Sequence, residues 1–250
     1  MTSGQAQESR LPSKERINRA GNRLRAELSG REQLSAREIA AELGVLTTFR
    51  RAHSDPLRKV SANLRYYVGK YSTVEDVPVI MSQRLKRMPT ILDKLLREPG
   101  MRLSRMEDIG GCRALFASTE EIMQAVEDID SQKRWKIVRH RNYIADPKQT
   151  SGYRAYHLIV SKDRLRIEVQ LRTLVQHQWA ELIERVDRKT GAGLKEGRAP
   201  LELTEYYRLG SELLAANEAG QRAAPITLQR FRQLHLEDSG RRDGRDDERS

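Results

Sequence analysis

The chain has 250 residues, a formal net charge of +11 and a pI near 9.9, which indicates polyanionic ligands such as nucleic acids, nucleotides or anionic membrane surfaces. Its single cysteine, Cys112, excludes an intramolecular disulfide, and because no Cys/His pair stands at finger spacing we expect no structural zinc. No apolar run approaches the roughly 20 residues of a membrane span, and residues 1–10 lack the apolar core of a signal peptide, so we expect a cytoplasmic protein with no membrane partner.

The first part of the chain is typical of two short helices after a polar start. Residues 1–10 are predicted to be disordered. Ser13 is placed to cap a helix over residues 14–28, and a capping box beginning at Ser35 opens a second helix that we expect to end at Gly44. The first helix has a conspicuously basic face, made of Lys14, Arg16, Arg19, Arg23 and Arg25. This face is either a solvated helix surface or a contact for RNA phosphates.

Two longer helices are predicted next, one with an apolar stripe and one with a basic face. Residues 55–71 place Leu57, Val60, Leu64 and Val68 at helical spacing, which is typical of a buried stripe. A connector over residues 73–81 leads to a second helical pattern over 82–96. Residues three and four apart share a helix face, so this pattern would form a cationic ridge of Arg84, Lys86, Arg87, Thr90, Lys94 and Arg97. An anion site and a solvated surface explain the ridge equally well.

Strand patterns begin at Asp108. Residues 108–118 are typical of a strand that starts with two glycines, and glycines there suggest close approach of another backbone or a ligand. Taken alone, Asp108 is more readily explained as a turn residue or a helix cap. A helix over residues 119–129, capped by Thr119, and a strand over residues 135–144 are expected to follow.

Residues 152–173 predict a β-hairpin with a polar face. In its second strand Leu165, Ile167, Val169 and Leu171 alternate with Arg166, Glu168, Gln170 and Arg172. In its first strand Tyr153 and His157 project to one side, where the ring offers a stacking surface to a base and the imidazole a hydrogen bond to a phosphate or hydroxyl. The charged face is either a solvated sheet surface or the floor of a site for an anion that also needs a carboxylate. Periodicity alone favours the solvated surface.

The remainder of the chain is predicted to be helical. Helices are expected over residues 174–186 and 201–216, with a glycine-containing loop over 188–200 between them and a weak helix after Pro225. The mixed-charge residues 238–250 are predicted to be disordered. Helices, then strands interleaved with helices, then helices again indicate an α+β fold in which helices pack a mixed β-sheet of about four to five strands.

Four motifs in this order resemble those of the synthetase domain of RelA/SpoT alarmone enzymes. They are Arg-x-Lys-x-x-x-Thr-x-x-x-Lys, where the family has Ser for Thr, then Asp-x-x-Gly-x-Arg, then Tyr-Ile-x-x-Pro-Lys followed by Gly-Tyr-Arg-x-x-His, and finally Glu-x-Gln-x-Arg-Thr. The matching positions are Arg84, Lys86, Thr90, Lys94, Asp108, Gly111, Arg113, Tyr143, Ile144, Pro147, Lys148, Gly152, Tyr153, Arg154, His157, Glu168, Gln170, Arg172 and Thr173. Four motifs in the right order are a far more specific signal than any one of them alone.

The resemblance implies a nucleotidyltransferase-like fold and a pyrophosphokinase that transfers the β,γ-pyrophosphate of ATP to a ribose 3′-hydroxyl with Mg²⁺. It implies that Asp108 and Glu168 hold Mg²⁺ and that Glu168 also assists deprotonation of the attacking hydroxyl. The ATP-binding residues that it implies are Arg84, Lys86, Thr90, Lys94 and Arg113. The acceptor-binding residues are Lys148, Tyr153, Arg154, His157, Gln170 and Arg172, with Tyr153 stacked on the acceptor base.

The chain departs from the family pattern at two places. Three residues instead of two separate Lys148 from Gly152, and Ile183-Glu184 stands where the family has Glu-His. No paired His-Asp metal motif of a hydrolase domain precedes the synthetase motifs, so the chain resembles the short, single-domain members. The expected parts are a basic helical extension over residues 1–54, the synthetase domain over 55–187, a helical extension over 188–237 and a disordered tail over 238–250.

Two acceptors fit this resemblance. One is GDP or GTP, which gives (p)ppGpp, and the other is the 3′ CCA end of tRNA, which some toxic short members modify. The net charge and the basic first helix favour RNA slightly, and a toxin would imply an antitoxin protein as partner. A hypothesis of another class is a catalytically silent nucleotide- or RNA-binding module of the same fold, against which the intact Asp108 and Glu168 argue.

Overall fold

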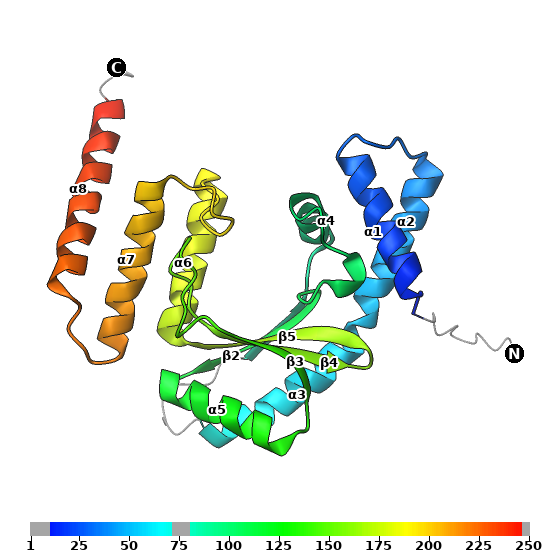
Figure 1. Ribbon diagram of the computed structural model, residues 1–250, viewed down its shortest axis with the longest axis horizontal. Coiled ribbons are helices and arrows are strands. Elements are labelled where there is room, and N and C mark those ends of the chain that lie inside the picture. The colour runs from blue at the N-terminus through cyan, green and yellow to red at the C-terminus, as the bar shows by residue number, and fades with distance from the viewer. Residues whose placement is uncertain (1–10, 72–80, 247–250) are drawn as a thin grey trace, which may run out of the picture.

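A five-stranded mixed sheet forms the centre of the molecule (Figure 1). The computed structural model describes residues 11–71 and 81–246, with side chains up to residue 235. The strands lie in the order β1-β2-β5-β4-β3, with β2 and β5 parallel and all other neighbours antiparallel. Their bounds are Met81–Leu85 for β1, Gly110–Phe116 for β2, Lys136–Asn142 for β3, Tyr156–Lys162 for β4 and Leu165–Thr173 for β5. The predicted α+β fold with a mixed sheet is confirmed.

Two helices cover one face of the sheet and enclose the main core. These are α3 (Ser54–Tyr71) and α5 (Thr119–Gln132), which lie below the sheet in Figure 1. The four residues of the predicted stripe on α3 are each at most 4% exposed. Burying one such side chain contributes about 1.5–3 kcal/mol, so the stripe fixes α3 against the sheet. The cap of α5 is Ser118 and not the predicted Thr119, because the Ser118 hydroxyl accepts the backbone N–H of Glu121.

The opposite face of the sheet is flanked by two groups of helices (Figure 1). On one side stand α1 (Lys14–Leu28), α2 (Ala36–Ala52), α4 (Met88–Arg97) and the 3-10 helix η1 (Leu103–Arg105). On the other side stand α6 (Leu174–Thr190), α7 (Leu201–Glu218) and α8 (Pro225–Asp246). A second apolar cluster joins α1, α2 and α4 through Ile17, Leu46, Phe49, Ile91 and Leu95. Within the described ranges, no helix is both long and apolar enough to cross a membrane.

The single helix predicted over residues 82–96 is wrong, because this segment divides into β1 and α4. Residues of β1 pair with β2, from Met81 opposite Ala114 to Leu85 opposite Gly110. Pro89 stands in the first turn of α4, where its fixed φ suits a helix start, and Arg87 directly before the helix has extended backbone with ψ 144°. Arg84 and Lys86 therefore lie on and just after a strand, and the cationic ridge on one helix face does not form.

Two other predicted boundaries are corrected. The second helix continues past Gly44 to Ala52, because Leu46 and Phe49 bury their side chains in the second cluster. This burial outweighs the roughly 1 kcal/mol that a glycine costs inside a helix. α8 runs to Asp246, into the segment predicted to be disordered, since no proline interrupts the chain after Pro225. The expectations for residues 1–10 and for most of the connector over 73–81 lie outside the described residues.

Candidate active site

The face of the sheet turned away from α3 and α5 carries most of the residues singled out by the motifs. Strand register arranges them in two rows that cross the strands. One row contains Ser82, Arg113, Gln170, His157 and Arg141, and the next contains Arg84, Gly111, Glu168, Ile159 and Arg139. The Glu168 side chain is only 14% exposed. The alternating polar face of β5 is therefore the floor of a site and not the solvated surface that periodicity alone favours.

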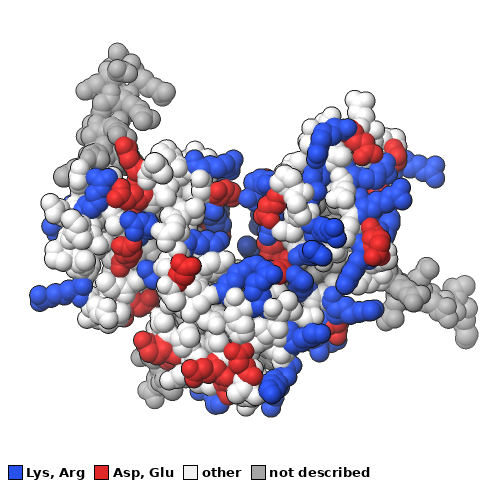
Figure 2. Space-filling model, viewed as in Figure 1, with Lys and Arg blue, Asp and Glu red and all other residues white. Residues whose placement is uncertain are grey.

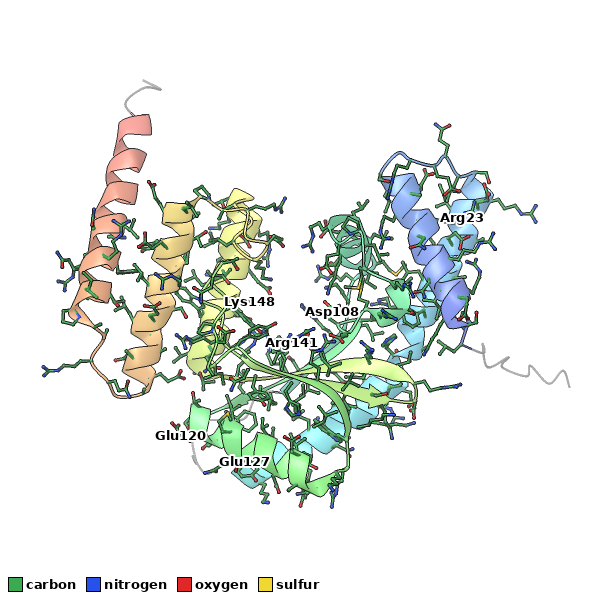
Figure 3. All side chains as sticks on the ribbon, viewed as in Figure 1. Arg23, Asp108, Glu120, Glu127, Arg141 and Lys148 are labelled. Carbon is green, nitrogen blue, oxygen red and sulfur yellow. The ribbon has the colours of Figure 1, made fainter. Side chains whose placement is uncertain are left out.

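A cleft of about 930 Å³ opens above this floor, between α4 on one side and α6 with its following loop on the other. Figure 2 shows the hollow, with Lys and Arg side chains along its walls. Eleven of the thirteen predicted site residues line it, namely Arg84, Lys86, Lys94, Asp108, Arg113, Lys148, Tyr153, His157, Glu168, Gln170 and Arg172. In Figure 3, Asp108 and Lys148 lie on opposite sides of the cleft with Arg141 on the floor between them. One site thus unites residues of all four motifs, which are spread over residues 84–173 of the sequence.

Two lysines hold Asp108 at the base of the α4 wall. Lys86 Nζ and Lys94 Nζ donate to the same oxygen, Asp108 Oδ2, at 2.9 and 3.0 Å. Burial alone would raise the pKa of Asp108, but the two ammonium groups outweigh burial and hold this pKa below its usual value. The other oxygen, Asp108 Oδ1, is buried and has no hydrogen-bond partner among the described residues. A buried ionised oxygen without a partner is suited to bind a cation.

Five side chains on and beside the floor of the cleft form a closed ring of hydrogen bonds. Arg172 Nη2 donates to Tyr153 Oη at 2.6 Å and to Gln170 Oε1 at 2.7 Å. Tyr153 Oη lies 2.7 Å from His157 Nε2, and His157 Nδ1 lies 3.1 Å from Glu168 Oε1. Gln170 Nε2 closes the ring by donating to Glu168 Oε2 at 2.8 Å. Both oxygens of the Glu168 carboxylate are therefore held in place.

The donor directions in this ring follow from its two ends. Arg172 can only donate, and an ionised Glu168 can only accept, so each arm runs from Arg172 to Glu168. Burial lowers the pKa of His157 and keeps the imidazole neutral, and burial raises the pKa of Tyr153 to about 12 and keeps the phenol protonated. Burial opposes ionisation of Glu168, but the bonds from His157 and Gln170 outweigh it and lower the Glu168 pKa to about 2. Hence Tyr153 donates to Nε2 of His157, and Nδ1–H of His157 donates to Glu168.

Comparison with known proteins shows which family the chain is similar to. A family model described as a region found in RelA/SpoT proteins matches residues 83–191. The GTP pyrophosphokinase YjbM of Bacillus subtilis (strain 168) is 30% identical over 157 residues, which cover 59% of this chain and 72% of that protein. The chain belongs to the RelA/SpoT family. Its enzyme class is the one that the motifs indicate, a pyrophosphokinase.

Two further comparisons concern a second relative and a solved structure. The GTP pyrophosphokinase YwaC of the same Bacillus strain is 26% identical over 144 residues, which cover 52% of this chain and 65% of that protein. The crystal structure of small alarmone synthetase 2 from Bacillus subtilis aligns with a TM-score of 0.57 at 21% identity, over 70% of this chain and 95% of that one. This structural likeness shows that the two chains share a fold.

The loop between Lys148 and Gly152 is anchored by α6 and α7. Gly152 N–H donates to Lys148 O at 2.8 Å, and Trp179 Nε1 donates to Ser151 O at 2.9 Å. Gly152 has φ +61°, and a Cβ added there would lie 2.4 Å from Ser211 Cβ. Only glycine fits this close approach. The anchored loop places the Lys148 ammonium 5.4 Å from the centre of the Tyr153 ring.

Two of the thirteen predicted site residues do not line the cleft. Thr90 is exposed in the first turn of α4. Arg154 turns away and donates to Ile144 O at 3.0 Å and to Ser211 Oγ at 3.4 Å, so it braces the strand against α7. The alternation of residues in an extended segment explains this, because Arg154 follows Tyr153 and must point to the other side.

Residues of the loop after α6, which belong to none of the four motifs, also line the cleft. Lys195, Glu196 and Arg198 line the cleft, and Arg97 Nη1 of α4 lies 3.7 Å from Glu196 Oε1 across it. The signal that could have found them is the run of glycines in this loop, since Gly191, Gly193 and Gly197 all have positive φ. Such glycines permit a compact loop that folds back over a site.

Proposed function

We propose that this protein transfers the β,γ-pyrophosphate of ATP to the ribose 3′-hydroxyl of GDP or GTP. The observation that carries the proposal is the convergence of Asp108 and Glu168 on one cation-lined cleft. Pyrophosphoryl transfer needs positioned cations around the donor phosphates and little covalent chemistry from the protein. Arg84, Lys86, Lys94 and Arg113 supply such cations on the donor side.

The family implies a divalent cation, and the residues present fit it. Within the described residues no group of three or more His, Cys, Asp or Glu could hold a metal, so the protein offers two separate carboxylates, Asp108 and Glu168. Mg²⁺ typically takes one or two carboxylates and completes its shell with water and substrate phosphates. When bound, it would neutralise charge on the transferred group. The unpartnered Asp108 Oδ1 supports Asp108 as one ligand.

The residues of the hydrogen-bonded ring act on the acceptor. The 3′-oxygen of the ribose attacks the β-phosphorus of ATP, the bond from that phosphorus to the α,β-bridging oxygen breaks, and AMP leaves. Glu168, ionised and held at both oxygens, accepts the hydrogen bond of the 3′-hydroxyl, directs its lone pair and takes up its proton as the new P–O bond forms. A weakly basic carboxylate suffices because proton loss is late in a loose transition state. Lys148 is placed to meet the acceptor's phosphates.

The contacts of the basic face of α1 weaken one of the sequence arguments for tRNA as acceptor. Three of the five basic residues on this face bind groups of their own chain. Arg16 and Arg23 pair with Glu42, Arg23 pairs also with Glu38 at 2.7 Å, and Arg25 contacts backbone carbonyls. Figure 3 shows Arg23 at the α1–α2 pair, away from the cleft. Relatives named GTP pyrophosphokinases favour a guanosine nucleotide.

The test is an acceptor assay with γ-labelled ATP. Purified protein is incubated with GDP, GTP or deacylated tRNA, with and without Mg²⁺, and the products are separated by size and charge. We expect label on the 3′ side of the guanosine nucleotide and an equal amount of AMP. Label found only in tRNA would show that the acceptor is tRNA and not a guanosine nucleotide. No transfer to any acceptor would favour the catalytically silent binding module. Glu168→Gln is the control for contaminating activity.

A further inference from the structure

Arg25 of α1 closes the C-terminal end of α4. Its Nε donates to Leu95 O at 2.7 Å, and its Nη2 donates to Met101 O in the segment that follows α4. The last four carbonyls of a helix have no partner within the helix, and a cation at that end also interacts favourably with the helix dipole. The Arg25 residue is only 9% exposed, so these bonds are made away from water. Arg25 is therefore built into the α4 wall.

Arg50 of α2 holds the other end of the same segment. Its Nε donates to Lys86 O at 2.6 Å, and its Nη2 lies 3.5 Å from Leu85 O, where β1 ends. The backbone N–H of Lys86 donates to Ile109 O at 2.8 Å. The main chain of Lys86 is thus fixed through both its carbonyl and its N–H. The fixed main chain sets the position from which the Lys86 side chain reaches Asp108.

The two arginines bracket the segment that bears the donor-side lysines. Lys94 directly precedes Leu95, and Lys86 is itself a contact of Arg50. A third tie lies farther along, where Asn18 Oδ1 of α1 accepts the Ser104 N–H at 3.0 Å on the way to Asp108. Both α1 and α2 lie outside residues 83–191, which the family model matches.

We propose that Arg25 and Arg50 are positioning residues for the donor site. They hold Lys94 and Lys86 at the spacing at which both ammonium groups meet one carboxylate in this structure and the donor phosphates during turnover. The inference rests on the proposed function, in which these lysines bind ATP. Under this proposal the α1–α2 pair supports the donor site, and it is neither an RNA-binding arm nor an inert extension.

Five variants test this proposal. Arg25→Met and Arg50→Met keep much of the side-chain length and remove the donors, whereas Arg25→Lys and Arg50→Lys keep the charge. Arg51→Met, at an exposed position in the same helix, is the matched control. The measurements are KM for ATP and for the acceptor, the Kd of a non-hydrolysable ATP analogue, and amide hydrogen exchange of α4 in the substrate-free protein.

We expect both Met variants to raise KM for ATP and the analogue Kd by about five- to thirtyfold, the ratio that corresponds to about 1–2 kcal/mol. The KM for the acceptor should stay at its wild-type value in the Met variants. Their α4 amides should exchange faster than in the wild type, whereas their α5 amides should not. The Lys variants should recover part of the lost affinity for ATP. If a Met variant fails to fold, the same measurements on the Lys variant at that position test the proposal.

Equal increases in both KM values, or an unchanged analogue Kd, would overturn the proposal. A wild-type protein that binds the analogue yet transfers no pyrophosphate would refute the proposed function instead. In that case the analogue Kd and the exchange of α4 still decide the role of the two arginines.

Discussion

Replacing Tyr153 by phenylalanine removes one oxygen from the ring of hydrogen bonds around Glu168 and leaves the aromatic ring in place. That oxygen accepts from Arg172 at 2.6 Å and donates to His157 at 2.7 Å. Without it, Nε2 of His157 loses its donor, in a side chain that is 8% exposed. An unsatisfied buried polar group costs about 1–3 kcal/mol, so Tyr153→Phe should lower the free energy of unfolding by that amount.

The catalytic effect should appear in kcat and not in KM for ATP. One arm of the ring, through Gln170, survives in Tyr153→Phe, but the arm through His157 no longer fixes which imidazole nitrogen carries the proton. If about 1–2 kcal/mol of this positioning acts in the transition state, kcat falls about five- to thirtyfold. The donor-side lysines make no contact with Tyr153 in the ring, so KM for ATP should not change.

Three measurements check this prediction against a matched control. They are steady-state kinetics with each substrate varied, urea unfolding, and ¹⁵N chemical shifts of the His157 imidazole, which should report a proton on Nδ1 in the wild type. Tyr66→Phe, at a position 55% exposed on α3, makes the same chemical change away from the site and should behave as wild type. Wild-type kcat together with wild-type stability in Tyr153→Phe, or a proton on Nε2 in the wild type, would refute the reasoning.

Three more predictions concern the loop, the cysteine and the carboxylate. Gly152→Ala should lower the free energy of unfolding by about 1–2 kcal/mol for its left-handed backbone and by a further 1–3 kcal/mol, roughly, for overpacking against Ser211. Gly191→Ala, at φ +64° with no atom near its Cβ, should lose only the backbone contribution in urea unfolding. Equal losses in the two variants would contradict the packing argument. Cys112 is buried, which raises its thiol pKa to about 12, so a disulfide reagent at neutral pH should label it only after unfolding, and rapid labelling of the folded protein would contradict this. Glu168→Gln should reduce AMP formation by about 10²–10⁴-fold with both substrates present, and near wild-type turnover would remove Glu168 from the mechanism.

Local patterns in the sequence predicted the elements whose stability is local. The capping box at Ser35 forms as expected, and the helix over residues 14–28 has its predicted bounds and its Ser13 cap. The apolar stripe of α3 is buried, and the alternation in β5 sorts its residues onto the two faces of the sheet. Each of these features depends on residues within one or two turns, or on one strand, so a single sequence contains the whole signal.

The errors arose where distant partners decide the structure. The cations from Arg84 to Arg97 stand at spacings that suit one helix, yet pairing with β2 makes residues 81–85 a strand. The cations of α1 look like a solvated or RNA-binding face, but Arg25 reaches carbonyls at residues 95 and 101, and Arg23 reaches Glu38 and Glu42. The roles of Lys195 and Glu196 at the cleft depend on a loop that folds back across it. No local pattern specifies such partners.

The net charge of +11 therefore does not identify RNA as the partner, because the position of each charge matters more than their sum. A cation that binds a carboxylate or a carbonyl of its own chain is unavailable to a phosphate unless the ligand replaces that partner. Lys86 and Lys94 are in this position on Asp108, so a donor phosphate must compete with a carboxylate for them. This competition disfavours a weakly bound single phosphate and favours a polyphosphate that contacts several cations at once. In the proposed function these two lysines bind the donor, so the competition at Asp108 favours a polyphosphate donor such as ATP, and the choice of acceptor rests with residues elsewhere in the cleft.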